Sequence, residues 1–251
     1  MFEIYALTDT GLKREHNEDC FLVNRFVTAS GERHEALESD FIIAVADGMG
    51  GEKAGEVASR LALDGFQDLS LPVTTEELVI TIRQIHDAIL DYGGRNCEAR
   101  GLGTTLVGLV CIGNKVTVFN VGDSRVYRFR DGMLKQLTTD HSLVQALLDA
   151  GQITREEAFH HPQKNIVVQS LGGSTATERL QVDIEPVRGL FEPNDMFLVC
   201  SDGLSDMVRD EEMEEILSRS TSVADAARAL VAKANEHGGH DNITLVVATR
   251  K

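Results

Sequence analysis

The residues of this sequence best suited to chemistry are aspartates at the ends of short apolar runs. Asp47 directly follows the run at residues 41–46, and Asp202 follows the run at residues 196–200 after a single serine. A glycine comes after each of these aspartates, which lets the backbone turn sharply and present a carbonyl oxygen. Carboxylate and carbonyl oxygens are hard ligands, so this pattern favours Mg²⁺ or Mn²⁺ over zinc.

Three further aspartates lie within two residues of other strand-like runs, and they are Asp19, Asp123 and Asp241. Antiparallel neighbours place the end of one strand beside the start of the next. If residues 20–27 pair with residues 41–46 as an antiparallel hairpin, Asp19 and Asp47 lie at the same sheet edge. The others reach that edge if their strands pair likewise, so we expect all five aspartates to converge.

Carboxylates that gather in this way repel one another. Two unit charges about 4 Å apart repel by ~4 kcal/mol at an effective dielectric constant of ~20. Either some of them bind protons at raised pKa values, or divalent cations lie among them. A single Asp-Gly pair is commonly an ordinary turn, and we interpret Asp131-Gly132 in this way. That interpretation is weaker for the pairs that begin at Asp47 and Asp202, because both follow fully apolar runs.

The elements that must position these residues are short runs rich in apolar and β-branched side chains. Turn signals such as Gly113-Asn114 separate several runs, which favours antiparallel hairpins over parallel strands with crossovers. The predicted strands are residues 2–7, 20–27, 41–46, 105–111, 116–121, 125–129, 196–200 and 243–248.

Helices are predicted in two blocks. Residues 54–69 place apolar side chains on one helical face, and residues 74–77 form a Thr-Thr-Glu-Glu capping box that opens a helix through Ile89. Nearer the end of the chain, residues 210–218 and a segment opened by Ser222 are also predicted helices. Strands and helices segregate instead of alternating. This predicts an α+β fold of four layers (α/β/β/α), an antiparallel β-sandwich flanked by helix pairs.

Residues 140–173 differ from the rest of the chain. They are polar, with short helical stretches only at 143–148 and 155–159, and they carry His141, His160 and His161. Both a mobile lid over a site and a plain surface excursion fit this composition.

Composition narrows the class of partner and the compartment. The 251 residues include 40 acidic and 24 basic ones, and a net charge of −16 would repel nucleic acid and anionic membranes. No secretory signal is recognisable, and the longest apolar runs fall short of the ~20 residues that span a bilayer. The four cysteines are far apart and form no CxxC pair, which indicates free thiols in a reducing compartment. We expect a cytoplasmic protein.

Competing phosphate chemistries leave motifs that this sequence lacks. It has no GxxxxGK[ST] loop, no GxGxxG loop and no GxSxG nucleophile elbow. It also has no loop of the cysteine-dependent phosphatase type and no zinc motif.

Together these residues resemble the type 2C, metal-dependent protein phosphatase family, in its bacterial-type branch. The resemblance runs from Arg14 to Thr249, and although each motif alone is weak, the ordered set is specific. The motifs are TDTG at 8–11, REHNED at 14–19, VADGMGG at 45–51, GTT at 103–105, NVGDSR at 120–125, LTTDHS at 137–142, LG at 171–172, SDGL at 201–204 and HDNIT at 240–244.

The resemblance implies a serine/threonine protein phosphatase that forms a single domain over residues 1–251, with residues 140–173 as its lid. The substrates would be phosphoserine and phosphothreonine in proteins, and the partners a serine/threonine kinase and the substrates of that kinase. Two or three Mn²⁺ or Mg²⁺ ions per chain would activate a water that attacks phosphorus in line. The resemblance also implies a cytoplasmic signalling enzyme, which we expect to be a monomer.

The same resemblance assigns roles at the acidic edge. Asp47 would bridge two metal ions, and the Gly48 carbonyl would bind one of them. Asp202 and Asp241 would bind the other ion. Asp47 and Asp202 are therefore expected among the catalytic residues.

Four more residues receive roles from the resemblance. Glu18 and Asp19 would act mainly through metal-bound waters. Asp123, with Asp202, would hold a third ion. Arg14 would bind the phosphate of the substrate and is the third expected catalytic residue.

The sequence departs from the family pattern at two places. Met49 follows the Asp-Gly pair where many eukaryotic members have a histidine proposed as the general acid, which leaves Glu52 and Lys53 further on and the general acid unassigned. Gln169 stands where bacterial relatives often have arginine, which bears on the contacts of the lid. Two other functions stay open. One is a non-catalytic member of the fold that binds phosphoproteins, and the other is a hydrolase of small phosphate esters.

Overall fold

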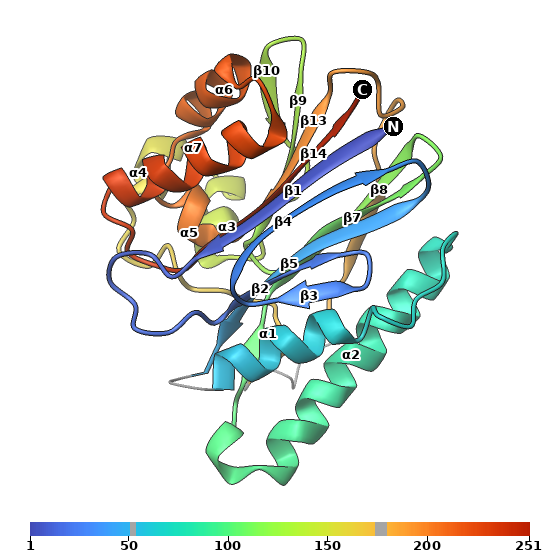
Figure 1. The fold of residues 1–251 in the computed structure, drawn as a ribbon. Coiled ribbons are helices and arrows are strands. Elements are labelled where there is room, and N and C mark those ends of the chain that lie inside the picture. The colour runs from blue at the N-terminus through green and yellow to red at the C-terminus, as the bar shows by residue number, and fades with distance from the viewer. Residues whose placement is uncertain (51–53, 174–179) are drawn as a thin grey trace.

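The computed structural model describes residues 1–50, 54–173 and 180–251, which form four layers (Figure 1). Two antiparallel sheets face each other in the middle, and a pair of helices covers the outer face of each sheet. One pair is α1 (Ala54–Asp64) and α2 (Thr75–Arg95), and the other is α6 (Asp210–Arg219) and α7 (Val223–Glu236). The predicted four-layer α+β sandwich is confirmed.

The sheet beneath α6 and α7 has six strands in the order β10-β9-β13-β14-β1-β4. Strand β14, from the end of the chain, pairs with β1 on one side and β13 on the other, so the two ends of the chain share one sheet. The strands are β1 (Phe2–Asp9), β4 (Gly31–Leu37), β9 (Arg125–Arg130), β10 (Met133–Gln136), β13 (Met196–Cys200) and β14 (Ile243–Arg250).

The sheet beneath α1 and α2 has the order β11-β6-β5-β7-β8-β12, and β2 joins it by pairing with both β5 and β3. Its long central strand β5 contacts β2 on one edge and β7 on the other. The strands are β2 (Asp19–Val23), β3 (Phe26–Thr28), β5 (Phe41–Met49), β6 (Gly103–Thr104), β7 (Leu106–Ile112), β8 (Lys115–Val121), β11 (Leu171–Gly172) and β12 (Asp183–Pro186).

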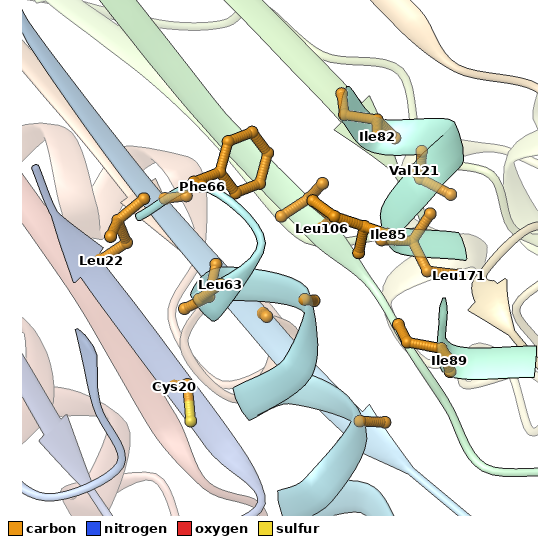
Figure 2. Packing of buried hydrophobic residues seen from close by; sticks show 14 of the residues in the cluster. Cys20, Leu22, Leu63, Phe66, Ile82, Ile85, Ile89, Leu106, Val121 and Leu171 are labelled. Carbon is orange, nitrogen blue, oxygen red and sulfur yellow. The ribbon is translucent and has the colours of Figure 1, made fainter. Parts of the chain in front are cut away.

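Apolar side chains fill the three spaces between the layers. Between the two sheets, four phenylalanine rings contact one another with centroids 4.7 to 5.3 Å apart, and they are Phe2, Phe41, Phe191 and Phe197. Figure 2 shows the space under α1 and α2, where Leu63 and Phe66 meet side chains of α2 and of the sheet. Phe66 stacks on Phe119 of β8 at 5.6 Å. Burial of this apolar surface is the main stabilising contribution to the fold.

One predicted strand is corrected by the structure. Residues 20–27 form two strands, β2 and β3, because the chain turns at Asn24 with a positive φ of 54°. Strands β3 and β4 therefore lie between β2 and β5 in the chain, so the predicted hairpin is wrong although β2 and β5 are antiparallel neighbours. Strands β4, β10 and β12 were not expected, since they carry exposed or half-exposed side chains and give no apolar signal.

The predicted helix at residues 54–69 is shorter than expected. Helix α1 ends at Asp64, and a Cβ on the next residue, Gly65, would lie 2.4 Å from a side-chain carbon of Ile85. The close approach of α2 thus coincides with the end of α1. Among the described residues, no helix is both long and apolar enough to cross a membrane.

Residues 140–173 contain two short helices, α3 (Leu143–Asp149) and α4 (Arg155–Phe159). An isolated antiparallel bridge between Ser142 and Val167 joins the two ends of this segment. The segment therefore leaves the sandwich and returns to it at nearly the same place.

The capping box at the start of α2 is confirmed and offers a test of what this helix contributes to stability. The Thr74 hydroxyl accepts a hydrogen bond from the Glu77 N–H at 3.2 Å, and the Glu77 carboxylate accepts one from the Thr74 N–H at 2.8 Å. Loss of an N-cap side chain costs about 1 kcal/mol. We expect Thr74→Ala to lower the free energy of unfolding by about 1 kcal/mol in urea denaturation. Thr81→Ala, in the interior of the same helix, should leave it unchanged or raise it slightly, because alanine is the better helix former. Equal losses in the two variants would contradict this assignment.

Candidate metal centre

The register of neighbouring strands brings the aspartates to one edge of the sandwich. Asp19 at the start of β2 lies directly opposite Asp47 in β5. Asp202 follows β13 as the first residue of α5 (Asp202–Ser205), and Asp241 precedes β14, which pairs with β13. Asp123 lies in the turn between β8 and β9, and β9 is the other neighbour of β13. The convergence expected from the sequence is present in the structure.

Four of these five aspartates line a cleft of about 430 Å³, together with Arg14, Glu18 and Gly48, and they are Asp47, Asp123, Asp202 and Asp241. Asp19 is not a lining residue. It is 1% exposed and lies behind the cleft, where its Oδ2 accepts a hydrogen bond from the Ser201 hydroxyl at 2.7 Å.

The carboxylates are held where their negative charge is costly. Burial, and after it the charges of neighbouring aspartates, raises the pKa of Asp47 well above its ordinary value. The same causes raise the pKa of Asp202 to about 7. Burial is also the first cause of the raised pKa values of Asp19, Asp123 and Glu18.

Unsatisfied oxygens at this edge fit a hard cation. Among the described residues, the Oδ1 atoms of Asp19 and Asp202 are buried and have no hydrogen-bond partner, and such an unpaired acceptor costs about 1–3 kcal/mol. A Cβ on Gly48 would lie 2.1 Å from the carbonyl oxygen of Gly55 and 2.7 Å from that of Glu18, so only glycine allows the backbones to approach this closely. Carboxylate and carbonyl oxygens are the ligands that Mg²⁺ and Mn²⁺ prefer.

These carboxylates do not by themselves form a complete chelating group. Within residues 1–50, 54–173 and 180–251, no three His, Cys, Asp or Glu side chains form a group that could hold an ion. Asp241 is engaged with Arg14, whose Nη2 lies 2.7 Å from its Oδ2. Mg²⁺ usually keeps several waters in its coordination sphere, so backbone carbonyls and water would complete the set of ligands.

Arg14 lies at the mouth of the cleft, on the loop between β1 and β2. Its side chain is 51% exposed, and its hydrogen bond to Asp241 is the first cause of its raised pKa. The loop is held from below by Asn242, whose Nδ2 donates to the carbonyl oxygens of Thr10 and His16 at 3.0 and 2.9 Å. An exposed guanidinium on an anchored loop is therefore presented to an incoming anion.

Sequence reasoning did not find Asp206. Its N–H donates to the carbonyl oxygen of Asp202 at 2.7 Å, and its charge contributes to the raised pKa values of Asp202 and Asp123. Lys164, from the segment 140–173, forms an ion pair with Asp206 at 2.9 Å. The spacing of the two aspartates by four residues, about one helical turn, is the signal that could have found it.

Thr105 was also missed, and it connects two of the acidic turns. Its hydroxyl accepts a hydrogen bond from the Asp47 N–H at 3.1 Å and shares another with the Ser124 hydroxyl at 2.8 Å. The backbone beside Asp47 and the backbone beside Asp123 are thereby held at a fixed separation. No spacing rule in the sequence indicates this contact, because it joins residues from different strands.

The residues after the Asp47-Gly48 pair bear on the choice of general acid. Met49 lines the cleft, but a thioether has no proton to give. Glu52 and Lys53 lie outside the described residues. His16 is the one histidine among the residues that line the cleft in the described part of the chain.

The segment 140–173 reaches the cleft at only two of its residues. Asn165 and Val167 are among the lining residues. The side chain of Gln169, in contrast, accepts a hydrogen bond from the Gln181 N–H at 3.2 Å. Gln169 is thus engaged with the neighbouring segment of the same chain and is not among the described residues that line the cleft.

Comparisons with known proteins place this chain in a family. Residues 31–236 match the family model for protein phosphatase 2C. The serine/threonine phosphatase stp of Listeria monocytogenes is 39% identical over 251 residues, which cover 97% of this chain and 94% of that protein. The crystal structure of the Mycobacterium tuberculosis serine/threonine phosphatase PstP/Ppp matches with a TM-score of 0.85 at 36% identity and covers both chains fully. The PstP catalytic domain in complex with two manganese ions matches with a TM-score of 0.79 at 35% identity over 99% of each chain. This chain therefore belongs to the protein phosphatase 2C family and is a serine/threonine protein phosphatase of the bacterial type.

Proposed function

We propose that this phosphatase acts on phosphoserine and phosphothreonine in proteins at the acidic cleft, with two or three Mn²⁺ or Mg²⁺ ions bound there. The observation that carries the proposal is the unsatisfied buried oxygens of Asp19 and Asp202 beside a cleft that Asp47, Asp123 and Asp241 also line. The two manganese ions in the PstP catalytic domain support the choice of metal.

Asp47 is the proposed bridge between two ions. It lies opposite Asp19 at the sheet edge. The carbonyl of the next residue, Gly48, which also lines the cleft, would bind one ion. Asp202 and Asp241, from the paired ends of β13 and β14, would hold the other. When bound, these ions supply a water nucleophile near neutral pH and offset the negative charge of the phosphate.

The remaining acidic residues have supporting roles in the proposal. Glu18 lines the cleft and Asp19 lies behind it. As the family resemblance implies, both would act mainly through metal-bound waters. Asp123 and Asp202 would hold a third ion, and the charge of Asp202 already raises the pKa of Asp123. With a net charge of −16, the protein needs such cations to attract a phosphorylated substrate.

Arg14 is the proposed phosphate-binding residue. Its guanidinium presents parallel N–H donors that match two oxygens of a phosphate. In the structure one donor is paired with Asp241 at 2.7 Å. Binding of phosphate would draw this donor from Asp241 and free that carboxylate to act as a ligand.

We further propose that the chain is one phosphatase domain with residues 140–173 as its lid, and that it works as a monomer in cytoplasmic signalling opposite a serine/threonine kinase. Alignment of 97% of the chain with a single relative supports one domain, and the contacts of Asn165 and Val167 with the cleft support a lid. Burial raises the pKa of the Cys200 thiol to about 12, so this thiol stays protonated and unreactive.

Metal dependence is the first test. Chelator should abolish hydrolysis of a phosphothreonine peptide, and Mn²⁺ should restore it, because the ions supply the nucleophile. We expect kcat/KM for the peptide to exceed that for a small aryl phosphate by at least about tenfold, which is about 1.4 kcal/mol of added binding to the transition state. The measurement is release of phosphate from each substrate across a metal titration.

The same assay separates the other functions. Activity that chelator leaves unchanged would contradict the proposed mechanism. Phosphoprotein binding without hydrolysis at any metal concentration would favour a non-catalytic member of the fold. A preference for the aryl phosphate would favour a hydrolase of small esters.

The role of Arg14 predicts a specific kinetic change. Loss of a hydrogen bond to a charged group costs about 1.5–3 kcal/mol, so Arg14→Ala should raise KM for a phosphopeptide about 10- to 100-fold, with kcat within about threefold of the parent. Lys13→Ala removes a neighbouring exposed cation and should leave both constants nearly unchanged. A large loss of kcat in Arg14→Ala with KM unaltered would reject phosphate binding by this residue.

A further inference from the structure

One histidine holds both polar backbone groups of the residue before Asp123. The Gly122 N–H donates to Nδ1 of His141 at 3.2 Å, and the Gly122 carbonyl accepts from the His141 N–H at 2.8 Å. Gly122 has a φ of 120°, and a Cβ there would lie 2.7 Å from Thr105, so the position requires glycine. Because glycine is free to adopt many backbone conformations, hydrogen bonds to both polar groups of Gly122 restrict the backbone that leads into Asp123.

His141 is itself held in one orientation. It is 7% exposed, and its Nε2 lies 3.0 Å from Oδ2 of Asp183. Because Nδ1 accepts from an amide, the ring proton must be on Nε2, where it is donated to the Asp183 carboxylate. Asp183 of β12 lies opposite Asn120 of β8, and the Asn120 amide donates to the same Gly122 carbonyl at 3.1 Å. A hydrogen-bond network therefore connects β12 to the turn that carries Asp123.

We propose that His141, oriented by Asp183, is a positioning residue that sets the place of the Asp123 carboxylate for the third metal ion. The inference rests on the proposed role of Asp123 as a ligand of that ion. His141 is not among the described residues that line the cleft, so its effect should be confined to the position of Asp123. Residues that orient metal ligands in this way typically change metal affinity 10- to 100-fold when replaced.

Two substitutions of His141 separate the hydrogen bonds of its side chain, one at Nδ1 to the Gly122 N–H and one at Nε2 to Asp183. In His141→Asn the amide oxygen can take the place of Nδ1 and still accept from the Gly122 N–H. In His141→Gln the longer amide reaches the place of Nε2 and leaves Gly122 without its acceptor. We expect His141→Gln to weaken the lowest-affinity Mn²⁺ site about 10- to 100-fold and His141→Asn to weaken it less than about threefold, with the tighter sites unchanged in both.

The readout is Mn²⁺ binding to the metal-free protein by calorimetry, with free Mn²⁺ followed by electron paramagnetic resonance. Asp123→Asn is the reference and should remove the lowest-affinity site. His86→Gln is the matched control, because His86 Nδ1 accepts the Gly172 N–H at 3.0 Å, the same kind of bond on α2. It should leave all sites unchanged. If His141→Gln does not fold, Asp183→Ala is tested instead. It removes the partner that orients the His141 imidazole and should weaken the lowest-affinity site about three- to tenfold.

Several results would overturn the inference. One is Mn²⁺ binding by His141→Gln that equals that of the parent, or the same result for Asp183→Ala where that variant replaces it. Another is an equal loss of Mn²⁺ affinity in the His141→Asn and His141→Gln variants. The others are a uniform weakening of all metal sites and the same loss of affinity in His86→Gln. If Asp123→Asn keeps the lowest-affinity site, the proposed role of Asp123 fails and this inference fails with it. If only the His141 variants behave as the parent, the role of Asp123 stands and His141 has no positioning effect.

Discussion

The structure depends on holding like charges together at one edge of a sandwich. Two carboxylates about 4 Å apart repel by ~4 kcal/mol at an effective dielectric constant of ~20, and burial adds the cost of desolvation. Strand register enforces this proximity. Asp19 and Asp47 are the last pair of the ladder between β2 and β5, in which Phe21 and Val23 face the other sheet and Leu22 faces α1 and α2. A slip of one residue would exchange these faces, so packing of the core fixes where the carboxylates lie.

Backbone contact at the other side of the cleft is equally close. A Cβ on Gly203 would lie 1.9 Å from the carbonyl oxygen of Asn242, which brings the loop after β13 against the loop before β14. The Ser201 hydroxyl accepts from the Thr244 N–H at 3.1 Å and donates to Asp19 at 2.7 Å, so it links the two sheets directly behind the cleft. Asp19 and Asp47 are the end pair of the ladder between β2 and β5, and Asp123, Asp202 and Asp241 lie outside the strands, in turns or beside strand ends. The local electrostatic cost is thus separated from the apolar layers that stabilise the fold.

Sequence reasoning succeeded where strands are long, continuous apolar runs. Strands β5, β7 and β14 are buried on both faces and read as continuous apolar runs, and the acids at the ends of β5 and β14 could be placed from pairing rules. It failed for β4, which has no buried side chain, and for the turn at Asn24 that splits β2 from β3. The pairing of Arg14 with Asp241 and the bond from Gly122 to His141 join residues far apart in sequence. Such contacts follow from the tertiary fold, and no local pattern contains them.

The contacts of His141 also bear on how the proposed lid is attached. The two ends of the segment 140–173 meet at this residue, because the His141 carbonyl accepts from the Val168 N–H at 2.8 Å and Ser142 bridges to Val167. Residues 140–142 are buried, whereas α4 has no buried side chain. Local stability follows burial, so the outer part of the segment can open at lower cost than its base. The base carries the hydrogen bonds between His141 and Gly122, so opening of the outer helices would leave these bonds in place.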